Sequence, residues 1–261
     1  TVELGEKTYN IEIAAGLLDQ IGAKARVLSQ AVKAAIISDS NVDPLYGERL
    51  ERSLAASEFE VTRIVFAAGE QSKNLTVLGQ VYDELARAGL TRSDLILTLG
   101  GGVPGDLGGF AAATFLRGID FIQVPTSLLA QIDSSVGGKV AIDLPSGKNL
   151  AGSFYQPKAV FIDPDLLKTL PLRFLHDGWA EAIKYGCIRD AGLFAQIAAV
   201  KSDQELLEQA DSLEQLRETL EDEQTVAGLY ASMDVSEVED LLQKVMILAD
   251  LEGRSLEYGR E

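Results

Sequence analysis

The sequence is poor in the side chains that most often hold transition metals, with one cysteine and one histidine in 261 residues. A single cysteine, Cys187, excludes an intrachain disulfide and a metal site made of cysteine alone. Basic residues are also few, 23 against 40 acidic ones, and the net charge of −17 argues against a nucleic-acid-binding surface. Most of this charge, −12 of the −17, falls in residues 201–261.

Long hydrophobic runs are absent as well. No apolar segment approaches the roughly 20 residues that cross a bilayer, and residues 1–16 have neither a basic start nor a leader-like apolar block. We therefore expect a cytoplasmic protein with no membrane partner. A hydrophobic content of 46% is enough for the core of one large or two modest domains.

The most informative stretch runs from residue 95 to residue 148. Leu95 to Leu99 is an apolar run typical of a strand buried on both faces, and three glycines, at 100–102, follow it. Glycine lets backbone N–H groups approach an anion, and Pro104 favours the first turn of a helix there. We place Asp106 in that first turn, near the positive end of the helix dipole or facing a ribose hydroxyl. A plain strand-to-helix connector is the alternative.

Two further polar breaks follow apolar segments in this stretch. The strand predicted at Phe121 to Val124 ends in Pro125, Thr126 and Ser127, and a third cluster spans residues 133–139. Loops that follow parallel strands gather at one edge of an α/β sheet, where ligands bind. The pattern predicts that these three breaks lie together.

Strand patterns alternate with helix patterns from the start of the sequence to residue 162. Buried strands are predicted at 34–37, 61–66, 95–99, 121–124 and 159–162, a hairpin at 1–14, and helices over most of the rest, including 204–220 and 235–251. This indicates an α/β, Rossmann-like domain with a mostly parallel sheet at 1–157 and an all-helical domain at 158–261. Asp39 and Asn41, after the first buried strand, either cap the next helix or hold an adenosine.

Five motifs together resemble the 3-dehydroquinate synthases, a family of sugar-phosphate cyclases. They are GGGVPGD from Gly100, PTSLLAQIDSSVGGK from Pro125, GKN from Gly147, DLLKTLP from Asp165 and AEAIKYG from Ala180. The resemblance is dense from about Asp39 to Ile188. It implies a phosphate-eliminating lyase of the shikimate pathway of aromatic amino acid biosynthesis, acting on a small phosphorylated keto acid. It also implies NAD that is consumed and regenerated in each turnover, a zinc or cobalt ion, and a homodimer.

The resemblance assigns roles residue by residue. Catalytic or substrate-binding positions are Arg117, Asp133, Lys139, Asn149 and Lys184, and Glu181 is a metal ligand. NAD-binding positions are Asp39, Asn41, Gly69, Glu70, Lys73, Gly101, Gly102, Val103, Asp106, Thr126, Ser127, Lys139, Lys148, Leu166, Leu167, Lys168 and Thr169.

Each charged candidate also has a simpler interpretation. Glu70 and Lys73 match an ion pair at a helix start, and Glu181 and Lys184 match an ordinary i,i+3 pair. Lys139 and Lys148 match solvated lysines in turns.

The sequence departs from the family at the metal site. The resemblance implies two histidine ligands beside Glu181, whereas the one histidine, His176, is predicted in a loop before the helix that carries Glu181. Five residues along a helix separate side chains by about 140°, so the two cannot share a metal unless the helix breaks. The residues after Ile188 are also too few for the family's helical domain. Either a segment is missing, or this is a remodelled relative that binds NAD without turnover. Another sugar-phosphate cyclase, or a dehydrogenase of the glycerol type with a similar glycine turn, is a further alternative.

Overall fold

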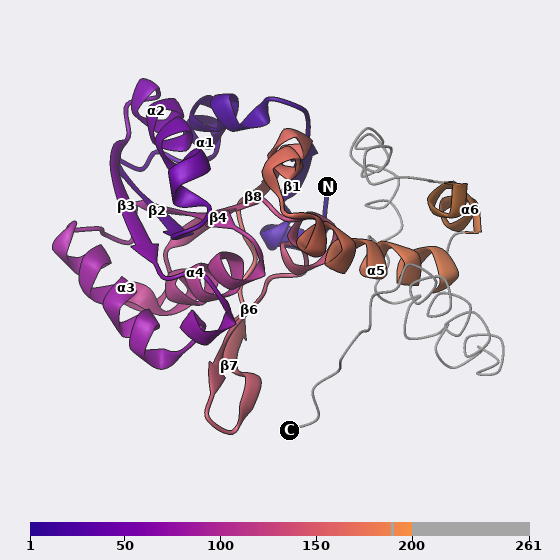
Figure 1. The fold of residues 1–261 in the computed structure, drawn as a ribbon. Coiled ribbons are helices and arrows are strands. Elements are labelled where there is room, and N and C mark those ends of the chain that lie inside the picture. Colours follow the sequence, from indigo (N-terminus) through magenta and orange to yellow (C-terminus); the bar gives the residue numbers. More distant parts are fainter. Residues whose placement is uncertain (189–190, 200–261) are drawn as a thin grey trace.

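The computed structural model describes residues 1–188 and 191–199, and the helices predicted at 204–220 and 235–251 lie outside them. Its centre is a six-stranded sheet in the order β1-β8-β5-β4-β2-β3, in which every neighbouring pair is parallel (Figure 1). The strands are β1 (Asn10–Ile13), β2 (Lys33–Asp39), β3 (Glu60–Phe66), β4 (Leu95–Gly100), β5 (Asp120–Pro125) and β8 (Ala159–Ile162). The prediction of a Rossmann-like fold with a mostly parallel sheet is confirmed.

Helices cover both faces of this sheet, so its central strands are apolar on both sides. On one face, η2 (Leu17–Gln20), α1 (Ile21–Leu28) and α2 (Glu48–Ala56) share a core with Ile36 and Leu97. On the other face, α3 (Leu75–Arg87) and α4 (Gly102–Thr114) share a core with Ile37 and Ile96. The chain therefore changes face between β2 and β4, which lie side by side in the sheet.

Helix α4 lies between the sheet and a two-stranded ribbon. Two glycines of α4 let the helix pack closely against each of them. A Cβ on Gly108 would lie 2.6 Å from Cγ2 of Thr98 in β4, and one on Gly109 would lie 2.4 Å from Cγ1 of Val140. Both distances are shorter than carbon atoms tolerate, so a larger residue at either position would move the helix.

The ribbon itself corrects the sequence-based prediction. Only Lys139 and Lys148 were assigned to turns here, whereas residues 139–154 form an antiparallel hairpin of β6 (Lys139–Leu144) and β7 (Gly147–Phe154), which extends away from the main sheet (Figure 1). Val140 and Ile142 are buried against α3 and α4. The alternation of these apolar residues with their neighbours is typical of a strand. The glycine and proline residues on either side favour turns and concealed that pattern.

The hairpin predicted at 1–14 is wrong. Val2 and Tyr9 form only an isolated antiparallel bridge, whereas β1 pairs in parallel with β8 over Asn10–Ile13. Residue alternation alone does not distinguish a hairpin strand from an edge strand that pairs with a distant segment.

The sheet also continues past the boundary predicted at residue 157, because β8 lies between β1 and β5. After β8 come η7 (Pro164–Thr169), α5 (Leu172–Ile188) and α6 (Ala191–Ala199). Leu175 and Ala182 of α5 share a core with Val160 and Ile162 of β8, so α5 packs on the α/β unit. The division into an α/β and a helical domain remains a prediction.

Candidate nucleotide-binding site

The carboxyl ends of the sheet strands lie at one edge, and most of the predicted site residues follow them. Asp39 is opposite Phe66, and Gly100 is opposite Pro125. The segments that leave this edge are those after β1, β2, β3, β4, β5 and β8. The edge is also where the chain changes face between β2 and β4, the position at which doubly wound sheets bind ligands.

The N-terminus of α4 forms the centre of this edge. Gly101 is its N-cap residue and contributes no side chain, so the N–H groups of Gly102 and Val103 face the edge as donors. A Cβ on Gly101 would lie 3.2 Å from Oγ of Ser127, and one on Gly102 would lie 3.5 Å from Oγ of Ser134. Backbone donors and two hydroxyls thus surround a cradle that a larger residue would fill, which suits a pyrophosphate.

The turn after β5 is joined directly to this cradle, because the N–H of Thr126 donates to the carbonyl of Gly100 at 2.9 Å. Ser127 comes next and begins the segment that leads to η6 (Ala130–Ser134). All three predicted breaks therefore reach this edge, the third through Ser134, which lies beside Gly102. Ser134, at the end of η6, is a cradle residue that sequence reasoning missed, because nothing local distinguishes it from Ser135, which is buried.

Asp106 does not lie in the first turn of α4 as predicted, because the helix begins at Gly102 and Pro104 is its third residue. Its carboxylate instead pairs with the ammonium of Lys73, which is 4% exposed. Burial raises the pKa of Asp106, while the hydrogen bond and charge of Lys73 act in the opposite direction. The nearby carboxylates of Glu70 and Asp143 raise that pKa further.

Lys73 has a second partner on the β6–β7 hairpin, since its Nζ donates to Oδ1 of Asn149 at 2.5 Å. Glu70 and Lys73 are therefore not the predicted helix-start pair. Glu70, in η4 (Glu70–Ser72) after Gly69, pairs with Lys148 at 3.3 Å. Both of these side chains are exposed, so this pair adds little stability but brings the hairpin turn to the segment after β3.

At the end of β2, Asp39 closes a turn rather than leaving its carboxylate open. Its Oδ1 accepts from the N–H groups of Asn41 and Val42 at 2.8 and 3.1 Å. This is the capping interpretation, since the turn leads into η3 (Asp43–Gly47) and α2. Asn41 is exposed at the same edge.

Residues Leu166 to Thr169 form part of η7, which follows β8. Leu166 and Leu167 are buried core residues, and Lys168 is exposed and pairs with Asp165. The phenol of Tyr46, in η3, contacts Oγ1 of Thr169 at 2.5 Å and donates to the carbonyl of Leu166 at 3.2 Å. The segments after β2 and after β8 are thereby joined.

A second group of predicted residues lies where α5 meets η6. The phenol of Tyr185 donates to Oδ1 of Asp133 at 3.1 Å. Burial raises the pKa of Tyr185, and the carboxylates of Asp133 and Glu181 raise it further. Gly178 allows this approach, because a Cβ there would lie 2.6 Å from Cβ of Leu128. Tyr185 is a second residue that the sequence prediction did not assign to the site.

Glu181 and Lys184 form an i,i+3 ion pair on α5, as the simpler interpretation predicts. His176 lies inside α5 and not in a loop, so about 140° separates it from Glu181 around an unbroken helix. Within residues 1–188 and 191–199, no three side chains of histidine, cysteine, aspartate or glutamate are grouped as a metal site. The residues described do not fit the metal that the family resemblance implies.

Two further predicted residues, Lys139 and Arg117, also lie outside the cradle. Lys139 is exposed at the start of β6. Arg117 ends η5 (Phe115–Arg117), after the C-terminus of α4 and three residues before β5 begins, so it lies at the amino edge of the sheet. The strand–helix–strand order contained this signal, because a helix that follows a strand returns the chain to the opposite edge.

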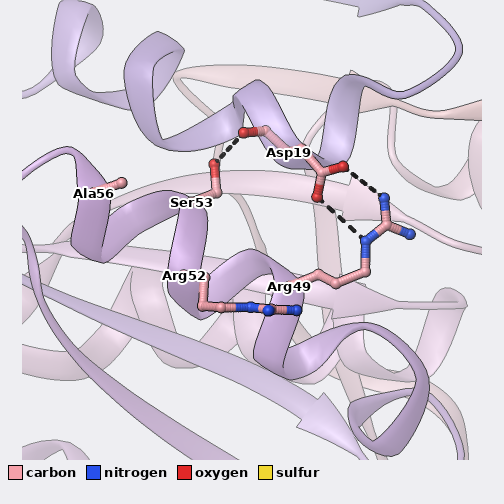
Figure 2. A pocket seen from close by; sticks show the side chains of 5 residues that line it. All are labelled: Asp19, Arg49, Arg52, Ser53 and Ala56. Atoms are coloured by element: carbon pink, nitrogen blue, oxygen red, sulfur yellow. Dashed lines mark hydrogen bonds and ion pairs between the residues drawn. The ribbon is translucent and has the colours of Figure 1, made fainter.

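A shallow pocket between η2 and α2 is separate from this site (Figure 2). Arg49 lines it and donates to both carboxylate oxygens of Asp19, at 3.2 and 2.9 Å, while Ser53 donates to the carbonyl of Asp19 at 2.8 Å. These polar groups are already paired with one another, and none of the predicted site residues lines the pocket.

Comparison with known proteins identifies related sequences over most of the chain. A family model described as 3-dehydroquinate synthase N-terminal matches residues 63–177. A 3-dehydroquinate synthase of Clostridium acetobutylicum is 57% identical over 207 residues, which cover 79% of this chain and 58% of the relative. One of Clostridium botulinum is 53% identical over 212 residues, which cover 81% of this chain and 61% of the relative. The chain thus spans about three-fifths of the length of these relatives.

Solved structures agree with this result. A 2-epi-5-epi-valiolone synthase from Streptomyces hygroscopicus with NAD+ and Zn2+ bound matches with a TM-score of 0.74 and 29% identity, over 84% of this chain and 62% of that one. A 2-deoxy-scyllo-inosose synthase complexed with carbaglucose-6-phosphate, NAD+ and Co2+ matches with a TM-score of 0.70 and 25% identity, over 82% and 59%. Among the described helices, none is long and apolar enough to cross a membrane.

Proposed function

We propose that this chain, which is similar to 3-dehydroquinate synthases over about four-fifths of its length, binds NAD+ at the carboxyl edge of its sheet. In this proposal it provides the cofactor-binding part of a lyase. The lyase converts 3-deoxy-D-arabino-heptulosonate 7-phosphate to 3-dehydroquinate and phosphate. The observation that carries the proposal is the cradle at the N-terminus of α4, where the Gly102 and Val103 amides meet the Ser127 and Ser134 hydroxyls.

The described residues fit a dinucleotide. The amides of the α4 N-terminus stabilise the negative charge of a pyrophosphate. Asn41 and the Asp39 turn lie on one side of this cradle, after β2, and Asp133 lies on the other, after β5. In the proposed complex the adenosine lies toward Asn41 and the nicotinamide toward Asp133. When bound, NAD+ accepts a hydride from a substrate carbon and returns it within the same turnover.

Exposed lysines on the β6–β7 hairpin, outside the cradle itself, suit a phosphorylated substrate. Lys148 is at the hairpin turn and Lys139 at the base of the hairpin, and both are exposed. Their ammonium groups attract the phosphate dianion and stabilise it as it leaves. Asp133, held by Tyr185, is a hydrogen-bond acceptor for a substrate hydroxyl. Lys184 precedes Tyr185 on α5 and brings a cation to the same end of the site.

No step of this mechanism is assigned to a metal, because the described residues offer only Glu181, and Lys184 already pairs with it. The ion pair between Glu181 and Lys184 favours a second candidate function, that of a relative that binds NAD+ without turnover. The two candidates share the nucleotide site and differ only in whether phosphate is released.

We also propose that the chain forms a homodimer. Arg117 lies at the amino edge of the sheet, so it can serve a substrate site at the carboxyl edge only in a second copy. The β6–β7 hairpin has exposed apolar side chains, with Leu150 at 59% and Phe154 at 79%. Light scattering on the purified chain tests this, and a monomer at micromolar concentration would contradict it.

The enzymatic proposal is tested by titrating the purified chain with NAD+ and then adding the seven-carbon substrate. Phosphate release without net NADH supports the lyase, and steady accumulation of NADH supports a dehydrogenase instead. NAD+ binding with neither product supports the binding relative. Absence of NAD+ binding at millimolar concentration would overturn both candidates.

A further inference from the structure

Asp143 is a residue that neither the sequence motifs nor the assigned roles single out, yet it joins the hairpin to the proposed site. Its N–H donates to the carbonyl of Lys73 at 2.7 Å, and Asn74 and Asp143 form an isolated parallel bridge. The β6 strand is thus fixed to the segment that leads into α3.

The hairpin is irregular at this residue. Ile142 is opposite Ala151 and Leu144 is opposite Gly147, so the single residue Asp143 faces three residues of β7. A bulge of this kind redirects side chains on the longer strand. Asn149 lies in the bulge with a φ of +56°, a left-handed conformation that residues other than glycine seldom adopt.

The carboxylate of Asp143 holds this conformation, because its Oδ1 accepts from the N–H of Asn149 at 2.8 Å. In that conformation the amide oxygen of Asn149 accepts from the buried ammonium of Lys73 at 2.5 Å. Asp143 therefore contacts Lys73 through the backbone and acts on the Lys73 side chain through Asn149.

We propose that Asp143 is a positioning residue, which holds Asn149 and, through it, the Lys73 ammonium in the geometry that binds NAD+. This rests on the proposed function. The role requires a hydrogen-bond acceptor and not a negative charge, since the group that Asp143 holds is a neutral N–H. Asparagine at position 143 can accept the same bond, whereas alanine cannot.

The test compares NAD+ affinity, by calorimetric titration, in the wild type and in Asp143→Ala, Asp143→Asn and Asn149→Gly. We expect Asp143→Ala to bind NAD+ about tenfold more weakly and Asp143→Asn to stay within about twofold of the wild type. In an Asn149→Gly background, Asp143→Ala should cause no further loss, because glycine adopts the left-handed conformation unaided and has no side chain to orient. Asp120→Ala, which removes an exposed carboxylate from β5 at the opposite edge, is the matched control.

Two results would overturn the positioning role. One is full NAD+ affinity in Asp143→Ala, and the other is an equal loss in Asp143→Ala and Asp143→Asn. Amide hydrogen exchange at Asn149 gives a readout that does not need NAD+, and it should be faster in Asp143→Ala but not in Asp143→Asn. If the wild type fails to bind NAD+ while exchange follows this pattern, the proposed function fails and the positioning of Asn149 stands. Unchanged exchange in Asp143→Ala would refute the positioning of Asn149, whether or not the wild type binds NAD+.

Discussion

Lys73 and Asn149 are 76 positions apart in the sequence, and the ammonium of one donates to the side-chain oxygen of the other at 2.5 Å. Lys73 follows β3 and Asn149 lies in β7, so this contact joins the hairpin to the segment after β3. Because Lys73 also pairs with Asp106 of α4, three segments of the chain meet at one buried cation.

Filling the cradle should weaken nucleotide binding without unfolding the protein. Gly101→Val places its side chain toward Ser127, where a Cβ alone would already lie 3.2 Å from Oγ. We expect at least about a tenfold loss of NAD+ affinity by calorimetry, because the pyrophosphate can no longer approach the α4 amides. Gly79→Ala in α3 is the control, since its Cβ meets nothing within 4 Å. Equal affinities in the two variants would show that the nucleotide binds elsewhere.

Asp106 should make stability depend on pH in an unusual direction for a carboxylate. Its pKa is raised, mainly by burial, so the folded state binds its proton more tightly than the unfolded state does. The contribution of Asp106 to stability is therefore largest below the ordinary aspartate pKa of about 4 and falls as pH rises through the folded pKa. Urea unfolding is measured between about pH 3.5 and 8, in steps of about half a pH unit. Between the ordinary aspartate pKa and the raised pKa of the folded state, the wild type should lose stability relative to Asp106→Asn. A relative gain by the wild type with rising pH would mean that Lys73, and not burial, dominates.

Glycine at position 109 should be required for the fit of α4 against the hairpin. A Cβ there would lie 2.4 Å from Cγ1 of Val140, so Gly109→Ala is expected to lower the free energy of unfolding by about 1–3 kcal/mol. Val140→Ala removes the clashing methyl groups, and the double variant should lose less stability than the two single variants added together. Strict additivity in urea unfolding would contradict the packing described here.

Tyr185 should lose its proton later than most of the seven tyrosines. Burial and the nearby carboxylates of Asp133 and Glu181 all raise its pKa above the ordinary value of about 10. In an ultraviolet titration, Tyr185→Phe should therefore remove amplitude only from the part above the ordinary tyrosine range. Loss of amplitude near pH 10 would mean that the contact with Asp133 is not formed in solution.

Much of this fold could be predicted because its signals are local. The apolar run Leu95 to Leu99 ends in a glycine turn, and that pattern predicted the central strand, its helix and the edge at which they meet. The turn at Thr126 and Ser127 was placed at the same edge for the same reason, since strands alternating with helices run parallel.

The remaining features depend on tertiary contacts that no local pattern encodes. The left-handed Asn149 and its partner Asp143 are set by a bulge, and a bulge is visible only once two strands are paired. The burial of Lys73 follows from the closing of the hairpin, so the sequence suggested a surface pair with Glu70 instead. Arg117 was assigned to the site by the family resemblance, whereas its position after α4 places it at the other edge.

The central claim is that the turns after β2, β3, β4 and β5 hold one nucleotide at the N-terminus of α4. A crystal structure of this chain grown with NAD+ tests it most directly. We predict that the pyrophosphate lies within hydrogen-bonding distance of the Gly102 and Val103 amides, with hydroxyl contacts from Ser127 and Ser134. A nucleotide bound instead in the pocket beside Asp19 and Arg49, or an α4 N-terminus without a nucleotide in crystals saturated with NAD+, would contradict it.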